Sequence, residues 1–332
     1  MRGTTWRTVK DFGTGCVRAP LFLRAQPCWT PGRRASIEAE ATRAKDAPGR
    51  AGPRPSPATG IGCIVTDPKP QHLGVGADGR RIAYLLEPAT RRDAHGLVWL
   101  CGLKSEMIST KATALADWAR ARGLACLRFD YSGHGQSQGR FEDGTVSRWL
   151  EEAEAAFHRL TRGPQVLIGS SMGGYIALLL LRKLLAETRP STAAQAARIK
   201  ALVLIAPAWD MTELMWQRLP PSARTQIEET GIFLRPSRYG DGPYPISHAL
   251  IEDGKRHLIG SAIFDPGRPV HIIHGLQDPD VPWEHTLDLV AHLSGDWTRI
   301  EAVPDGEHRL SRPQDISLLL DMIGRLVDGA PT

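Results

Sequence analysis

The chain has 332 residues and a mass of 36.3 kDa, and 42% of its residues are hydrophobic, so it can bury one large α/β domain or two smaller domains. Its net charge of +5 comes from residues 1–60, which carry eleven Lys and Arg against four Asp and Glu. The remaining residues carry a net charge of −2, which excludes the broad basic face of a nucleic-acid-binding protein.

Residues 1–65 are rich in Arg, Ala, Pro and Gly and show no sustained periodicity, so we expect a disordered N-terminal extension. This composition fits an organellar transit peptide, or residues that precede the true start of the protein. The extension lacks the continuous apolar core of a secretory signal. No membrane span is expected either, because the apolar run at residues 175–181 stops at Arg182.

The five cysteines are scattered along the chain and form no C-x-x-C pair. They are Cys16, Cys28, Cys63, Cys101 and Cys126. An odd, scattered set favours a reducing intracellular compartment over secretion. That compartment is the cytoplasm if the protein is bacterial, or the mitochondrion if the extension is a transit peptide. Cys101 and Cys126 fall in expected strands, so we predict that both are small buried residues.

From about residue 70 onward, continuous apolar strands alternate with helices. The expected strands lie at residues 81–87, 97–101, 124–129, 166–168, 201–205, 270–273 and 298–303. The expected helices lie at residues 111–122 and 146–160, from the turn after Ser171 to about 185, and at 283–293 and 313–327. Strands of this kind predict an α/β domain over residues 66–330, with a mostly parallel central sheet flanked by helices.

Residues 208–268 interrupt this alternation between two expected core strands. The segment is apolar yet irregular in pattern, which suggests a short cap over an active site. Trp209, Met215, Trp216 and Phe233 are its candidate substrate-pocket residues. The alternative is an insertion at the edge of the domain that packs for stability only.

An apolar strand, a glycine-rich turn and a helix follow one another around Ser171. Gly169 and Gly173 flank this serine in the pattern G-x-S-x-G, the nucleophile elbow, in which a strained turn exposes a serine hydroxyl above a sheet. A side chain at either glycine would collide with a neighbouring element at so sharp a bend. The turn also places the backbone N–H of Met172 at a helix N-terminus, where it can face an oxyanion. The plainer interpretation of Ser171 is an ordinary turn serine.

A second match to the same pattern surrounds Ser137, between Gly135 and Gly139. Its strand ends several residues earlier, and a charged segment follows where a buried helix should begin. We therefore predict a structural serine at this position.

A serine hydroxyl needs a base, and the base needs an acid that orients it. In this type of fold the chain order is serine, acid and histidine, on loops after successive strands. His308 follows the last expected strand and is the candidate base. Asp278 is the favoured acid, with Asp280 as its local rival and Asp210 as a rival one strand earlier. Asp305 fits a turn residue.

The second oxyanion donor is expected in the loop after residues 97–101, where the backbone N–H of Leu103 follows Gly102. His271 and His274 lie three residues apart in a strand, so their side chains point to opposite faces and form no metal pair. His274 fits a structural role in the turn that it begins. The sequence carries no metal, nucleotide or flavin signature, and this chemistry needs no cofactor.

These motifs together resemble the α/β-hydrolase superfamily over residues 70–327. The matching segments are Asp130-Tyr131-Ser132-Gly133-His134-Gly135-Gln136-Ser137, Gly169-Ser170-Ser171-Met172-Gly173-Gly174, His274-Gly275-Leu276-Gln277-Asp278, Val281-Pro282-Trp283 and Gly306-Glu307-His308. The first segment, with Cys126–Phe129 before it, and the second are most similar to the branch of mitochondrial acyl-glucuronide esterases and palmitoyl-protein thioesterases with their bacterial relatives. One departure is Cys101-Gly102, where many members carry His-Gly or Pro-Gly.

The resemblance implies an α/β-hydrolase fold and hydrolysis of acyl esters and S-acyl thioesters. It places Ser171, Asp278 and His308 at the triad positions and explains Ser137 as part of a recurring structural loop. The substrate is then a small ester or an S-acylated protein, and the apolar cap favours a medium or long acyl chain. The alternatives are a peptidase or C–C hydrolase on the same triad, or a hydrolase fold that binds without catalysis.

Overall fold

The structure, a computed structural model, describes residues 69–329 except residues 93, 188, 238–241 and 261. The expected extension over residues 1–65 lies outside the described residues, and so do Cys16, Cys28 and Cys63. Cys101 and Cys126 are free and buried, as the sequence predicts. Within the described part of the chain, no helix is long and apolar enough to cross a bilayer.

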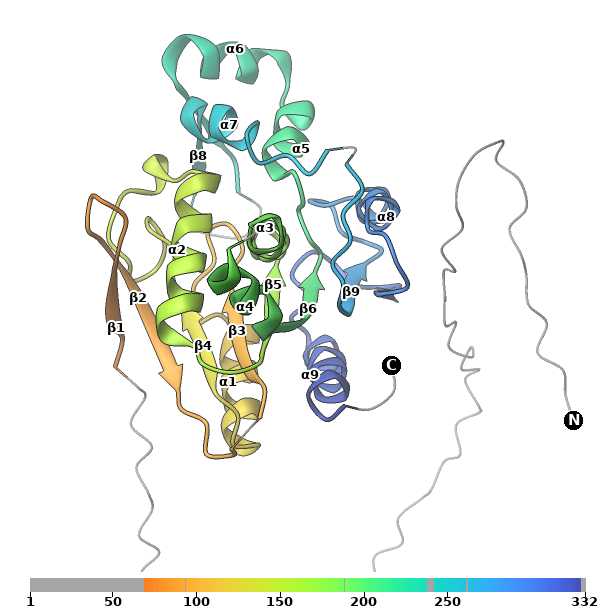
Figure 1. The fold of residues 1–332 in the computed structure, drawn as a ribbon. Coiled ribbons are helices and arrows are strands. Elements are labelled where there is room, and N and C mark those ends of the chain that lie inside the picture. The colour runs from red at the N-terminus through yellow and green to blue at the C-terminus, as the bar shows by residue number, and fades with distance from the viewer. Residues whose placement is uncertain (1–68, 93, 188, 238–241, 261, 330–332) are drawn as a thin grey trace, which may run out of the picture. The chain divides into compact units, whose positions relative to one another are not determined.

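The central sheet has eight strands in the order β1-β2-β4-β3-β5-β6-β9-β10 (Figure 1). Strand β2 runs antiparallel to β1 and β4, and the other neighbouring strands are parallel. The central strands are buried along almost their whole length, which explains their continuous apolar sequences. The predicted mostly parallel sheet is therefore confirmed. The strands are Gln71–Val75 (β1), Arg80–Glu87 (β2), Gly96–Leu100 (β3), Cys126–Phe129 (β4), Gln165–Ser170 (β5), Ile199–Ile205 (β6), Val270–Gly275 (β9) and Thr298–Val303 (β10).

Helices cover both faces of the sheet. Helices α2, α3 and α4 pack side by side in front of it in Figure 1, whereas α1 and α9 pack against each other. These helices, with α8, are Thr110–Ala121 (α1), Val146–Leu160 (α2), Met172–Ala186 (α3), Pro190–Arg198 (α4), Trp283–His292 (α8) and Pro313–Val327 (α9). Helix α4 was not predicted, although Pro190 at its first turn and its alanines are typical of a short helix.

The insertion (residues 208–268) is more regular than its sequence pattern indicates. It contains Met211–Arg218 (α5), Pro221–Thr230 (α6), Ile232–Arg235 (β7), Tyr244–Ser247 (β8) and His248–Gly254 (α7). Strands β7 and β8 form a separate antiparallel pair. A small core of its own holds the insertion together, made of Leu219, Ala223, Ile227, Ile246 and Ile251. Figure 1 shows α6 and α7 at the top of the view, beyond the upper end of α2, and α7 contacts α2.

Both ends of the insertion meet at the side chain of Asp210. One carboxylate oxygen accepts the N–H of Ile259 at 2.7 Å and the other accepts the N–H of Gly260 at 2.8 Å. Asp210 itself has a left-handed backbone (φ 47°), which aspartate tolerates better than most residues. Both of its carboxylate oxygens are therefore occupied by hydrogen bonds that join the start of the insertion to its return segment.

Candidate active site

Ser171 lies on the turn between β5 and α3. Its backbone is in a strained region (φ 54°, ψ −116°), held by a 2.8 Å hydrogen bond from its N–H to the carbonyl of Ile205. A Cβ on Gly173 would overlap the carbonyl of Leu100, and a Cβ on Gly169 would overlap that of Gly173. The two glycines are therefore required by close backbone approach, as the elbow pattern predicts.

The structure brings Ser171, His308 and Asp278 together from three separate loops. Nε2 of His308 lies 3.1 Å from Oγ of Ser171, and Nδ1 of His308 lies 2.7 Å from Oδ2 of Asp278. The Asp278 side chain is fully buried and that of His308 is 15% exposed. This arrangement links a hydroxyl, an imidazole and a carboxylate in one chain of hydrogen bonds.

The two oxygens of Asp278 have different partners. Oδ1 accepts the N–H groups of Asp280 and Val281 at 2.8 and 2.9 Å, which leaves Oδ2 for His308. Burial alone would raise the pKa of Asp278, but the bond and charge of His308 and these N–H groups outweigh it. The net pKa lies below its usual value, so the carboxylate stays ionised.

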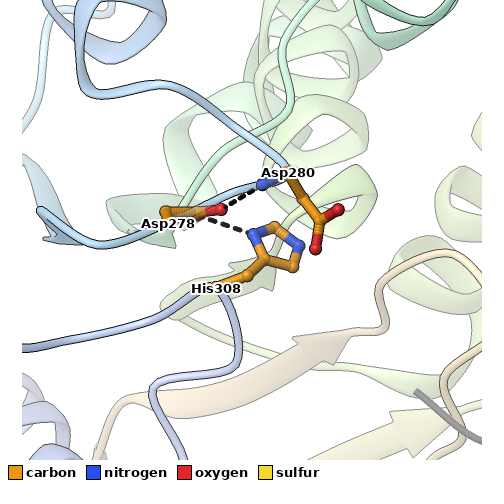
Figure 2. A group of neighbouring side chains, drawn as sticks. All are labelled: Asp278, Asp280 and His308. Atoms are coloured by element: carbon orange, nitrogen blue, oxygen red, sulfur yellow. Dashed lines mark hydrogen bonds and ion pairs between the residues drawn. The ribbon is translucent and has the colours of Figure 1, made fainter. Parts of the chain in front are cut away.

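The rival acids occupy other places. Figure 2 shows that Asp280 bonds to Asp278 through its backbone N–H, while its own carboxylate lies beside the ring of His308. Asp210 holds the insertion, as described above. Asp305 pairs with Arg312 at 2.8 Å, which agrees with its expected place in a turn.

His274 supports the loop that carries Asp278. Its ring is fully buried, with Nδ1 2.8 Å from Oγ1 of Thr286 and Nε2 3.1 Å from the carbonyl of Val281. It has the structural role that the sequence predicts. His271 lies in the same strand, also buried.

Asp278, Asp280 and His308 also lie close enough for one metal ion, since their ligand atoms are all within 4.8 Å of one another. Of the ring nitrogens, Nδ1 already bonds to Asp278 and Nε2 to Ser171. A metal at this place would compete with those bonds. The donor set therefore fits the hydrogen-bonded chain better than a metal site.

Two backbone N–H groups lie near Ser171. Met172 is the first residue of α3, where an N–H has no acceptor within the helix. Residues 102–105 form a turn closed by a 3.1 Å bond from Ser105 N–H to the carbonyl of Gly102, with Leu103 at its corner. A Cβ on Gly102 would lie 3.4 Å from Cβ of Ser171, so this turn sits directly against the serine. The role of both N–H groups as oxyanion donors remains a prediction.

The four candidate pocket residues lie in different surroundings. Trp209 is only 7% exposed, stacks on His285 at 4.9 Å and donates its indole N–H to that residue's carbonyl, so it presents little surface to a ligand. Met215, Trp216 and Phe233 are half-buried against the insertion's small core. Their role as pocket residues remains a prediction.

A cavity of about 240 Å³ lies elsewhere, next to the turn that contains Leu103. Its lining is Lys104, Glu106, Gly133, His134, Gly135, Phe141, Glu142 and Pro245. None of these lining residues was predicted as a site residue, although Lys104 directly follows Leu103, a predicted oxyanion donor. The cavity is therefore bordered both by the sheet's loops and by β8 of the insertion.

Ser137 is a structural residue. Its hydroxyl accepts the N–H of Ala83 at 2.7 Å and donates to the carbonyl of Asp130 at 2.6 Å. The first bond fastens the loop after β4 to β2, and the second ties the loop to the residue that directly follows β4. The second G-x-S-x-G match is thus accounted for, as predicted.

Comparison with known proteins shows the family of the chain. The family profile described as serine aminopeptidase, S33, matches residues 94–236. A putative hydrolase from Agrobacterium vitis with a solved structure has 40% sequence identity to this chain. Its structure matches with a TM-score of 0.73, and the match covers 79% of this chain and 100% of that chain. A mostly parallel sheet with a serine on the sharp turn before a helix defines an α/β-hydrolase, and the chain belongs to the α/β-hydrolase family.

Within that family, the chain is related to the mitochondrial palmitoyl-protein thioesterase ABHD10. The Bos taurus protein is 31% identical over 238 residues, which cover 71% of this chain and 74% of that protein. The solved structure of mouse ABHD10 is 27% identical, with a TM-score of 0.68 over 79% of this chain and 100% of that chain. The resemblance inferred from the sequence motifs is confirmed.

Proposed function

We propose that the protein is a serine hydrolase that cleaves carboxylic esters or acyl thioesters with Ser171, His308 and Asp278 as its catalytic triad. The observation that carries the proposal is the hydrogen-bonded chain from Ser171 through His308 to Asp278. The name of the related ABHD10 proteins supports the thioester part of the proposal.

In the first half-reaction, Oγ of Ser171 attacks the acyl carbonyl while Nε2 of His308 takes the hydroxyl proton. Asp278 keeps the Nδ1–H tautomer in place and stabilises the imidazolium. The N–H groups of Met172 and Leu103 hold the oxygen of the tetrahedral intermediate, and each such donor contributes on the order of 3 kcal/mol. The bond from the acyl carbon to the leaving oxygen or sulfur then breaks, and His308 donates the proton to that leaving atom.

In the second half-reaction, water attacks the acyl-Ser171 ester. His308 takes a proton from the water and passes it to Oγ as the acyl–oxygen bond breaks. The products are a carboxylic acid and an alcohol or thiol, and Ser171 is restored. Every proton moved in these steps passes through His308, and the two half-reactions balance without a cofactor.

The half-buried apolar side chains of the insertion favour an acyl group of medium or long chain. Met215, Trp216 and Phe233 are the residues that would contact it. Rates on a series of esters from acetyl to palmitoyl test this point, and a sharp preference for acetyl esters would contradict it.

The triad is tested by labelling with a fluorophosphonate and by ester turnover. We expect the wild-type protein to label, and Ser171→Ala to lose both labelling and about four or more orders of magnitude in kcat. Ser137→Ala is the matched control, since it removes a serine from the same sequence pattern and should still label. An unlabelled wild type would contradict the proposal and favour a hydrolase fold that only binds. Labelling of Ser137 in place of Ser171 would contradict the assignment of the nucleophile.

The family profile's description favours one second function, a peptidase on the same triad. An ester, a thioester and an amide with one common acyl group distinguish the two functions. Faster cleavage of the amide than of the ester and the thioester would assign the protein to peptide substrates instead.

A further inference from the structure

The loop that carries His308 has a strained backbone. It connects β10 to α9, and Leu310, two residues after the histidine, has a left-handed backbone with φ 44°. A leucine adopts that conformation only when its surroundings enforce it. At one end the loop is held by the N–H of Gln277, which donates to the carbonyl of Gly306 at 2.9 Å. At the other end Arg312 pairs with Asp305 and Asp315.

The middle of the loop is held by a lysine from a distant helix. Nζ of Lys111 donates to the carbonyl of Arg309, the residue directly after His308, and to Oγ of Ser311 at 3.2 Å. Lys111 belongs to the first turn of α1 and is separated from these acceptors by about two hundred residues of sequence. Both of its acceptors belong to the histidine loop.

The position of Lys111 is costly for a charged group. Its side chain is almost completely buried, with the residue only 9% exposed. A positive charge in the first turn of a helix is also opposed by the helix dipole. Burial lowers the pKa of Lys111 to about 8, and the charge of Glu307 acts against this shift. Neither burial nor helix stability therefore explains a lysine here, whereas the two acceptors on the loop do.

We propose that Lys111 is a positioning residue, which fixes the backbone at Arg309 and so keeps the ring of His308 within reach of both Ser171 and Asp278. The inference rests on the proposed hydrolase function for its catalytic consequence, but its structural consequence can be measured without activity. Misplacement of a catalytic group by about 1 Å costs roughly a hundredfold in rate, so a small shift of this loop is enough to matter.

The main variant is Lys111→Met, which keeps the length of the side chain and removes its charge and its donors. We expect kcat to fall about 10- to 100-fold with KM nearly unchanged, because the apolar pocket is untouched. Lys111→Arg keeps a charged hydrogen-bond donor facing the loop, so its kcat should be close to that of the wild type. Lys183→Met is the matched control, since Lys183 pairs with Glu154 on the surface of α3 and α2, and it should retain wild-type kcat.

A second readout follows His308 directly by NMR. The proton on Nδ1 that is shared with Asp278 should give a low-field resonance, assigned by its loss in His308→Gln. We expect this resonance to be lost or strongly broadened in Lys111→Met and to persist in Lys111→Arg and Lys183→Met. If Lys111→Met does not fold, Lys111→Gln, an uncharged but shorter donor, must show the same broadening and a partial loss of kcat.

The two proposals fail in different ways. A wild type that neither labels nor hydrolyses refutes the hydrolase function, while the NMR comparison still decides the role of Lys111. An active wild type whose Lys111→Met variant keeps kcat and the low-field resonance, and loses only thermal stability, shows that Lys111 is merely structural and overturns the inference.

Discussion

Asp278 shows how much chemistry depends on which atom of a side chain faces which partner. Because Oδ1 is occupied by two backbone N–H groups, Oδ2 alone remains for His308. The carboxylate is thus oriented before any substrate arrives. Its neighbour Asp280 contributes one of those N–H groups, and a side-chain change at Asp280 leaves that group in place.

This arrangement predicts opposite outcomes for two conservative substitutions. In Asp278→Asn the amide oxygen would take the backbone N–H groups, and the NH₂ would face Nδ1 of His308. That orientation forces the proton onto Nε2, the wrong tautomer for a base, so kcat should fall about 10⁴-fold. Asp280→Asn should stay within a few fold of wild type. Ester turnover and the rate of phosphonate labelling measure both, and equal losses in the two variants would contradict the assignment.

The sequence favoured Asp278 as the acid but left two rivals, Asp280 in the same loop and Asp210 one strand earlier. Asp278 and Asp280 are two residues apart in a segment with no periodic constraint, and the turn between them decides which side chain faces inward. The serine and histidine of the proposed triad were easier to choose, because the elbow pattern selects Ser171 and because His308 is the only histidine after β10. The cavity residues around Lys104 were missed because they come from four separate segments.

At the scale of elements, the junction of the insertion with the sheet depends on one carboxylate. Asp210 accepts an N–H from each of Ile259 and Gly260, and its left-handed backbone suits aspartate or asparagine. Tyr175 of α3 adds a 2.9 Å bond from its hydroxyl to the carbonyl of His257. The return segment of the insertion is therefore held from two sides.

Asp210→Ala removes both acceptors and places alanine in an unfavourable backbone conformation. We expect the free energy of unfolding to fall by about 2–4 kcal/mol, because the buried N–H of Ile259 and the half-buried N–H of Gly260 lose their acceptor. Proteolytic cleavage within residues 208–268 should also become faster. Asp210→Asn, which keeps one acceptor and tolerates the backbone, should lose less.

Urea denaturation and limited proteolysis give the two measurements. Asp288 is exposed on α8, so Asp288→Ala is the control for the loss of a carboxylate that does not hold the insertion. Equal unfolding curves for Asp210→Ala and Asp288→Ala would show that the junction does not depend on Asp210.

The buried strands and the long helices were predictable, and the short helices of the insertion were not. Buried parallel strands have an unbroken apolar sequence, and α2 and α9 are each fifteen residues long with one clear apolar face. Helices of the insertion have seven to ten residues, and two consecutive prolines precede and begin α6. Such short helices are stabilised by packing on their neighbours rather than by their own pattern.

At the scale of the whole molecule, buried histidines couple folding to pH. Burial lowers the pKa of His134 and of His271 from 6.5 to about 4, and Nε2 of each ring has no hydrogen-bond partner among the described residues. The unfolded chain binds these protons at higher pH than the folded protein does. Their contribution to stability is therefore complete above pH 6.5 and is lost as the pH falls through about 4.

Urea unfolding between pH 4 and 8 measures this dependence. We expect stability to fall across that window by up to roughly 3 kcal/mol per histidine. His271→Gln should be less stable than wild type at pH 7.5 and should show a shallower loss towards pH 4. Parallel stability profiles for the two proteins would argue against His271 as a source of the acid sensitivity.

The junction at Asp210 has a wider consequence for how this fold can diversify. A segment of about fifty residues leaves the sheet at Asp210 and returns to the same side chain, which accepts two of its backbone N–H groups. The two hydrogen bonds offset part of the entropy that is lost when a loop of this length closes. Another segment with equally close ends could be grafted there without shifting a strand. With the acyl-binding role proposed above for the insertion, an exchange of this segment would change substrate preference while the proposed catalytic residues stay in place.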